Sequence, residues 1–333
     1  MPTNVLLASA SCEAGHLIRL SSDGKLALTY GISNFIQLWE TTDGLRLKCP
    51  LMHQQQNQNI QPSIRSDDLE DMSSEGDICS CAVSNQAVIV GGTGNGLLYL
   101  WYGEGHNSVM VLEIHQPNLI SWCEFSPDGQ RFVSADTEGI IVMWQLIDGR
   151  EKMEVNMVPL EGHEESIELV LFSPGQARRI ASCSDDNTLH LYSGPSGDLV
   201  KKITKNDDGV ERIAWSSDGS MLASGDGKGQ LNIWDGLTGE LKQHLPILTG
   251  FILDVCFTYE DRYLCTRDLH EGVIHIYDVT TGKQVSCLLF SAPICTVSSS
   301  PSPWVICGLK DASVKFIKLH SIAGKRITEI MYE

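Results

Sequence analysis

The feature that most constrains the fold of this chain is a short alternating segment that ends in an aromatic residue and recurs along almost the whole sequence. Six copies end at Trp39, Trp101, Trp144, Tyr192, Trp234 and Tyr277, and a weaker seventh ends at Ile317. The intervals between these ends are 62, 43, 48, 42, 43 and 40 residues. A period of about 40–45 residues is typical of chains that repeat and stack one supersecondary unit. The sequence therefore predicts a repeat architecture.

A second signal keeps the same phase as the aromatic ends. Turns rich in Ser, Pro, Asp and Gly begin 18 or 19 residues before the aromatic, at Ser21–Lys25, Ser126–Gln130, Ser173–Gly175 and Ser216–Ser220. Each turn separates two short apolar runs that alternate with period two, which is the pattern of a β-hairpin and not of a helix. Two further runs complete each unit, so we expect four short strands per repeat.

One unit carries enough detail to indicate a family. Gly162–His163, the Ser-Pro-Gly turn, Ser182, Asp186 and Tyr192 stand in the order and spacing of a WD repeat, and Trp234–Asp235 supplies the dipeptide itself. The chain resembles the WD-repeat family over about residues 15 to 320. This resemblance implies an all-β fold, a seven-bladed WD-repeat β-propeller with four-stranded antiparallel blades, in which residues 1–333 form a single propeller.

The same resemblance implies a role for four of these side chains. His163, Ser182 and Asp186 have the composition of a nucleophilic triad, but with Tyr192 they match the buried structural tetrad of the family. Tyr192 stands where the family usually has Trp, so a phenol O–H replaces an indole N–H.

The preceding repeat offers a partial copy of the tetrad, in which we expect glutamate in place of the aspartate. Its members are His115, Ser134, Glu138 and Trp144.

Composition narrows the partners and the compartment. The formal net charge is −18, which disfavours nucleic acid and acidic membrane surfaces as partners. The eleven cysteines are odd in number and scattered, which favours a reducing compartment. We expect a cytoplasmic protein, with a nuclear location left open. Gly91–Gly96 lacks the full phosphate-loop pattern, and no Cys/His spacing typical of zinc occurs, so neither cofactor nor metal is predicted.

The long first interval contains an insertion. Residues 51–77 are rich in Gln and Asn and then acidic, so we expect a disordered loop between the first two blades. It is either a tolerated surface insertion or a regulated segment, in which Ser74, followed by Glu75 and Asp77, is a candidate phosphorylation site. Two segments compete to complete the last blade, Val5–Ser9 and Ile327–Tyr332.

The resemblance implies a non-enzymatic scaffold that binds peptides or domains on the top face of the propeller. This propeller would be the sensor or regulatory part of a larger signalling protein, or a substrate-receptor subunit of a ubiquitin-ligase or trafficking complex. A propeller-based enzyme is the alternative of a different class. The expected partners are other proteins, with basic segments favoured by an acidic patch, and the propeller is expected to be monomeric within a complex. The candidate top-face residues are Ser121, Glu168, Asp185, Glu211, Leu253, His270 and Lys310.

Overall fold

The computed structural model describes residues 17–30, 35–41, 46–52, 77–102, 108–148, 153–204, 209–246, 250–268, 273–290, 294–299, 304–309, 314–322 and 325–332. Within these residues the chain forms seven four-stranded sheets, and every strand pair is antiparallel. We number the sheets blade 1 to blade 7 in chain order. The all-β class and the four-stranded antiparallel unit predicted from the repeats are confirmed.

The strands of each blade follow one another along the chain. Blades 1 to 4 contain β1 Leu17–Leu20, β2 Leu26–Tyr30, β3 Phe35–Glu40, β4 Arg46–Met52; β5 Ile78–Val83, β6 Ile89–Thr93, β7 Leu98–Tyr102, β8 Ser108–Leu112; β9 Ile120–Phe125, β10 Arg131–Asp136, β11 Ile141–Asp148, β12 Met153–Pro159; and β13 Ile167–Phe172, β14 Arg179–Ser184, β15 Leu189–Ser193, β16 Leu199–Ile203. Blades 5 to 7 contain β17 Val210–Trp215, β18 Met221–Asp226, β19 Leu231–Asp235, β20 Leu241–Leu245; β21 Ile252–Phe257, β22 Tyr263–Asp268, β23 Val273–Asp278, β24 Lys283–Leu289; and β25 Ile294–Ser299, β26 Trp304–Leu309, β27 Val314–Ile322, β28 Lys325–Tyr332. The one helical turn among the described residues is the 3₁₀ turn Tyr259–Asp261.

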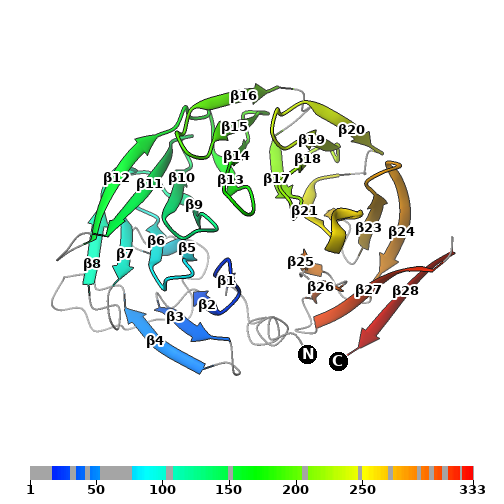
Figure 1. Cartoon of the computed structure of the whole chain (residues 1–333), viewed down its shortest axis with the longest axis horizontal. Helices are drawn as coiled ribbons and strands as arrows, with labels where there is room; N and C mark the ends of the chain where they lie inside the picture. Colours follow the sequence, from blue (N-terminus) through cyan, green and yellow to red (C-terminus); the bar gives the residue numbers. More distant parts are fainter. Residues whose placement is uncertain are drawn as a thin grey trace, which may run out of the picture.

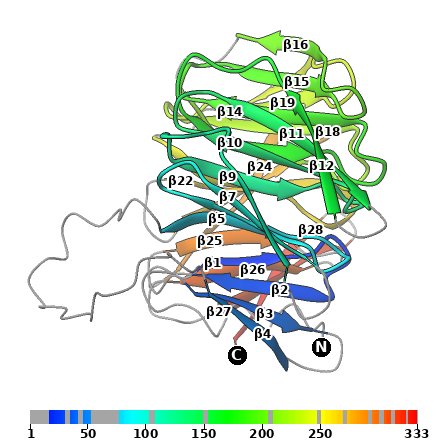
Figure 2. The same ribbon diagram turned by 90° about the vertical axis from the view of Figure 1, so that its left-hand side faces the viewer.

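The seven blades are arranged as a ring (Figure 1). The first strand of each blade lies toward the centre and the fourth lies on the rim, and the ring returns from blade 7 toward blade 1. Successive inner strands contact one another from β1 and β5 through to β21 and β25. Viewed from the side, the strands of neighbouring blades are stacked (Figure 2). No helix in the described part of the chain has the length and apolar character of a membrane-spanning segment.

The turn that leaves each inner strand shows how the repeated Ser-x-Asp-Gly signal works. In blade 3 the Ser126 hydroxyl donates to Asp128 Oδ1 at 2.6 Å, and the Gly129 N–H donates to the Ser126 carbonyl at 2.8 Å. Gly129 has φ +69°, a conformation in which glycine has no steric penalty. Equivalent serine–aspartate bonds close the turns of blades 1 and 5.

The hydrophobic core lies between neighbouring blades. One cluster joins Val90 and Leu100 of blade 2 to Ile120 and Phe132 of blade 3, all fully buried. The apolar blade faces that meet in such clusters are shielded from water. Each Å² of apolar surface buried in this way stabilises the fold by about 25 cal/mol. A blade alone would expose these faces, so neighbouring blades stabilise one another.

Two expectations are settled by the described strands. Ile327–Tyr332 belongs to β28, which pairs with β27 and completes blade 7, while Val5–Ser9 lies outside the described residues. The inserted loop was predicted to begin at residue 51, which is wrong: Leu51 and Met52 end β4, because β3 already begins at Phe35 and pairs Phe35 with Met52. Residues 53–76, including Ser74, lie outside the described residues.

Candidate functional site

The structure brings His163, Ser182, Asp186 and Tyr192 together inside blade 4. His163 Nδ1 lies 3.0 Å from Asp186 Oδ2, and His163 Nε2 lies 2.7 Å from Ser182 Oγ. An ionised carboxylate only accepts hydrogen bonds, so the imidazole proton is on Nδ1 and Ser182 donates to Nε2. A Ser-His-Asp triad has the same hydrogen-bond pattern, but Ser182 is fully buried, so its hydroxyl does not face an outside substrate.

The tyrosine joins this group differently from a tryptophan. Its hydroxyl donates to the carbonyl of Glu161 at 2.6 Å and lies 3.4 Å from Ser182 Oγ. A phenol has one proton, and that proton is used on Glu161, so Tyr192 gives Ser182 no strong hydrogen bond. It instead accepts from Nδ1 of His190, at 3.0 Å.

His190 is the member of this site that the sequence interpretation missed. In the sequence it looks like an ordinary residue of the third strand. In the structure its ring stacks on the His163 ring with 3.8 Å between centroids and 17° between planes. It is 1% exposed, and its Nε2 has no hydrogen-bond partner. The local sequence does not mark His190 as a member of the site. Its position opposite Ser182 depends on the pairing of β15 with β14.

Three of these side chains also raise the question of a metal. Ligand atoms of His163, Asp186 and His190 all lie within 4.8 Å of one another. Both nitrogens of His163, however, already have hydrogen-bond partners, Asp186 and Ser182. Zinc needs convergent ligands at about 2.0–2.1 Å. The arrangement fits a hydrogen-bond network better than a metal centre.

The charge states within blade 4 follow from burial and from these bonds. Burial alone would raise the pKa of Asp186, but hydrogen bonds from the Thr188 hydroxyl and the Glu164 N–H outweigh it and lower the pKa to about 2. Burial lowers the pKa of His163, and it lowers the pKa of His190 to about 4 with help from the His163 and Lys202 charges. Both imidazoles are therefore neutral at pH 7.

Blade 3 contains a second complete tetrad, and the acid predicted for it is wrong. His115 Nδ1 lies 2.9 Å from Asp136 Oδ2, not beside Glu138, and His115 Nε2 lies 2.7 Å from Ser134 Oγ. Asp136 ends β10 and also accepts the N–H groups of Glu138 and Ile140. Sequence spacing pointed to Glu138 because it was counted back from the aromatic. The carboxylate two residues earlier is the one directed into the blade.

The recurrent aromatic donates to a hydroxyl of the second strand in three of the blades that carry Trp at this position. Trp144 Nε1 donates to Ser134 Oγ at 2.9 Å, and Trp234 Nε1 donates to Ser224 Oγ at 2.8 Å. In blade 1 Trp39 donates in the same way to Thr29. The indole thus ties the third strand to the second.

The predicted top-face residues are best placed by the path of the chain. Each inner strand starts at one end of the ring and leads into the first turn of its blade at the other end, the turn that carries Ser-x-Asp-Gly in blades 1, 3 and 5. The second strand runs back, so the turn between the second and third strands lies at the same end as the start of the inner strand. We call that end the top face and the opposite end, with the Ser-x-Asp-Gly turns, the bottom face. Glu168 and Glu211 are each the second residue of an inner strand, and Asp185 lies in the β14–β15 turn.

One of these carboxylates pairs with an arginine that the sequence interpretation omitted. Arg212 Nη1 pairs with Glu168 Oε2 at 3.3 Å and donates to the Glu211 backbone carbonyl, and Arg212 Nε donates to the Leu253 carbonyl at 3.0 Å. Asp185 lies near Gly209, two residues before Glu211: a methyl group built on Gly209 would lie 3.4 Å from Asp185 Oδ1. The charge of Glu168 is thus partly neutralised, which the charge pattern alone did not reveal.

The remaining predicted residues are less informative. Ser121 donates to the Ala135 carbonyl at 3.4 Å within blade 3, and Leu253 contributes its carbonyl to Arg212. His270 and Lys310 lie outside the described residues.

Three segments of the chain match a known family of protein repeats. Residues 106–145, 155–193 and 197–235 match the family described as WD domain, G-beta repeat. These segments cover most of blades 3, 4 and 5, where the two complete tetrads and the Trp234–Ser224 bond lie.

The individual proteins that the chain resembles are distant relatives, and each match covers less than half of this chain. The chain is 27% identical over 148 residues to protein transport protein sec13 of Neurospora crassa, a match that covers 42% of this chain and 49% of that protein. It is 24% identical over 182 residues to protein hir1 of Emericella nidulans, covering 48% of this chain and 18% of that protein. A similar match to HIR1 of Kluyveromyces lactis covers 46% of this chain and 21% of that protein. The chain therefore spans half or less of the length of these relatives.

Proposed function

We propose, from the premise that this chain is a WD-repeat protein, that it is a non-enzymatic platform that binds a basic segment of another protein on its top face. The observation that supports this most directly is that Glu168, Glu211 and Asp185 lie at the same end of the neighbouring blades 4 and 5, where the guanidinium of Arg212 pairs with Glu168. Three carboxylates and one guanidinium give these four residues a net negative charge. Like charges held together repel one another, so a cationic partner would relieve an interaction that folding does not need.

The charge of the whole chain supports the same partner. With a net charge of −18, the protein attracts basic segments over distances of about a Debye length and repels nucleic acid. A rigid ring of stacked blades presents the group without a change of backbone shape. Such preorganisation reduces the entropy lost on binding.

The tetrads argue for the structural rather than the enzymatic alternative. In both blades the histidine bridges a serine and an aspartate of its own blade, and both serines, Ser134 and Ser182, are completely buried. A nucleophile must come within about 3–3.5 Å of the reacting atom of the substrate. In our proposal these triads hold strands together.

We also propose the kind of larger protein or complex to which the platform belongs, and its compartment. The hir1 match covers 18% of that protein, which supports a propeller that serves as one part of a longer regulatory protein. The name of the sec13 relative supports the alternative of a subunit in protein transport. Eight cysteines are free among the described residues, and most are buried, which supports a reducing compartment, the cytoplasm or the nucleus.

The test reverses the charge of this group. Glu168→Lys with Glu211→Lys is compared with Glu154→Lys with Glu240→Lys, two exposed positions away from the group whose reversal changes net charge equally. Partners captured by the native protein from cells are quantified for each variant. We expect captured proteins to fall at least about tenfold for the first pair and to persist for the control. Retention of the same partners by the folded first pair, at low as well as at physiological salt, would exclude the top face as the binding surface.

A further inference from the structure

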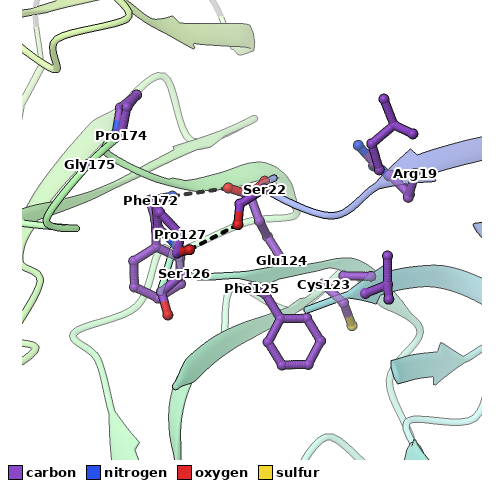
Figure 3. A pocket seen from close by; sticks show the side chains of 13 residues that line it. Arg19, Ser22, Cys123, Glu124, Phe125, Ser126, Pro127, Phe172, Pro174 and Gly175 are labelled. Atoms are coloured by element: carbon purple, nitrogen blue, oxygen red, sulfur yellow. Dashed lines mark hydrogen bonds between the residues drawn. The ribbon is translucent and has the colours of Figure 1, made fainter. Parts of the chain in front are cut away.

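A pocket of about 470 Å³ lies at the bottom face, at the opposite end of the ring from the ion pair between Arg212 and Glu168. Four successive inner strands and their turns contribute to it: β1, β5, β9 and β13. Figure 3 shows Arg19 on β1 on one side, and Phe172 and Pro174 of blade 4 on the other. Its volume is in the range of sites that bind small molecules or single side chains.

Two hydrogen bonds between blades hold the walls of the pocket. The Ser22 hydroxyl donates to the Pro127 carbonyl at 2.9 Å, which joins the turns of blades 1 and 3 (Figure 3). The Phe172 N–H of blade 4 donates to Glu124 Oε1 of blade 3 at 3.2 Å. The pocket is therefore part of the rigid ring rather than a fold in a surface loop.

The lining combines one carboxylate with an apolar wall. Pro127 and Pro174 present rings, and Ala82 and Val83 of β5 add aliphatic surface, while Phe125 and Phe172 border the pocket with side chains that pack in the clusters between blades. Oε1 of Glu124 accepts the Phe172 N–H, and Oε2 is the oxygen more accessible to hydrogen bonding by a ligand.

Arg19 leaves the carboxylate of Glu124 incompletely compensated. Its Cζ lies 3.7 Å from the centre of the Trp122 ring, so the guanidinium is held by a cation–π contact. Burial raises the pKa of Glu124 to about 7, although the Arg19 charge and the hydrogen bonds from Phe172 and Trp122 lower it. The anion of Glu124 is thus destabilised by its surroundings in the free protein.

We propose that this pocket binds a lysine side chain of a partner protein, with its ammonium on Glu124 and its four-carbon stem against the proline rings and the aliphatic surface of β5. A cation restores the charge balance that burial of Glu124 disturbs, and the long aliphatic stem matches the apolar wall. The net charge of −18 draws such a segment toward the ring.

The hydrogen bond already made by Glu124 favours lysine over arginine. A guanidinium binds carboxylates best through two parallel hydrogen bonds, one to each oxygen. The Phe172 N–H competes for Oε1 and so weakens that pairing, whereas an ammonium needs only one oxygen and can approach Oε2.

Binding would depend on pH with a definite sign. Only the ionised form of Glu124 attracts an ammonium, so affinity should rise as pH increases through 7. Arg19 is the charged group that faces Glu124 from β1. Among the described lining residues, β5 and β13 add no charge, and the buried Cys123 thiol stays neutral because burial raises its pKa to about 12. From pH 6 to pH 8 the ionised fraction grows about tenfold, and the affinity should grow with it.

The experiment uses Nα-acetyl-lysine amide as the probe and follows the Phe172 amide by NMR. We expect saturable shifts with an affinity about tenfold higher at pH 8 than at pH 6. Nα,Nε-diacetyl-lysine amide, which has no charge, should not bind, and Nα-acetyl-arginine amide should bind more weakly than lysine.

Two variants complete the test. Glu124→Gln should weaken lysine binding at pH 8 at least tenfold and remove the pH dependence, whereas Asp128→Asn, at an exposed carboxylate on the adjoining turn, should change neither. Should Glu124→Gln not fold, the sign of the wild-type pH dependence still decides. Absence of shifts at Phe172, affinity that falls with pH, or equal binding of arginine would each overturn the proposal. The top-face pair Glu168→Lys with Glu211→Lys should leave the probe's binding unchanged, so the two sites can fail independently.

Discussion

Blades 3 and 4 contain the same histidine–serine–aspartate hydrogen bonds but differ in the residues around them. In both, a histidine joins a serine of the second strand to an aspartate, with Nε2 to Ser at 2.7 Å and Nδ1 to Asp at 2.9 Å or 3.0 Å. In blade 3 the acid is Asp136, the last residue of β10, whereas in blade 4 it is Asp186, two residues beyond the end of β14. The position of the carboxylate in space is therefore kept while its position in sequence is not.

The two blades differ more at the other end of the tetrad. Blade 3 has Trp144, whose indole donates to Ser134, and Val142 opposite that serine. Blade 4 has Tyr192 and, in the place of Val142, His190. Since the phenol proton is used on the Glu161 carbonyl, the tyrosine needs His190 as a donor to its oxygen. The exchange of one aromatic is thus accompanied by a second polar residue, and blade 4 gains a titratable group that blade 3 lacks.

The largest difference between the blades should appear when each aspartate is removed. The Asp136 side chain is fully buried and accepts from His115 and from two backbone N–H groups, so Asp136→Ala leaves the buried His115 donor and two part-buried N–H groups unpaired. We expect a loss of about 3–5 kcal/mol. The Asp186 side chain, at 6% exposure, lies closer to water, and Asp186→Ala should cost about 1–3 kcal/mol.

Urea unfolding of the two variants measures this order, and Glu138→Ala serves as the control. Glu138 was the acid expected from sequence spacing, yet it contributes only its N–H to Asp136, so its replacement should cost less than about 0.5 kcal/mol. A loss for Glu138→Ala as large as that for Asp136→Ala would show that the assignment of the acid in blade 3 is wrong.

The same comparison shows how far sequence reasoning reaches. The period of the aromatic ends and the Ser-x-Asp-Gly turns predicted the all-β repeat, because both signals are local and each unit has to bury the same faces. The tetrad of blade 4 was implied by the resemblance to the WD-repeat family, since all four residues stand in the family's order and spacing.

What spacing could not supply was pairing across strands and between blades. Asp136 was missed in favour of Glu138 because the turn length in blade 3 differs, and His190 was missed because its partner Ser182 lies on another strand. Arg212 was missed for a third reason: its contacts with Glu168 and with the Leu253 carbonyl join three different blades. Such contacts exist only after the ring closes, so no local pattern encodes them.

A second difference between the blades should appear on acidification. Because burial and the neighbouring positive charges lower the pKa of His190 to about 4, the folded protein binds fewer protons than the unfolded chain between pH 6.5 and pH 4. This contribution to stability is complete above pH 6.5 and is lost as the pH falls toward 4, by about 2–3 kcal/mol. His190→Val reproduces the residue of blade 3 and should flatten the fall in the free energy of unfolding over this interval, as measured by urea titration at each pH. An unchanged slope would mean that His190 is not the group that takes up the proton.

The smallest effect tests whether His190 and Tyr192 act as a pair. Tyr192→Phe removes the donor to the Glu161 carbonyl and the acceptor of His190 Nδ1, and since His190 Nε2 has no partner, the imidazole would then have none. In the native background this should cost about 2 kcal/mol, of which the part that involves His190 disappears when His190 is already valine. Tyr192→Phe should therefore cost about 0.5–1 kcal/mol less in the His190→Val background, and this difference is the coupling energy of a double-mutant cycle. Trp144→Phe, measured with Val142→Ala in blade 3, is the matched cycle, in which no hydrogen bond joins the two positions and the coupling should come from packing alone. If the two cycles gave the same coupling, the second polar residue of blade 4 would have no connection with the exchange of Trp for Tyr.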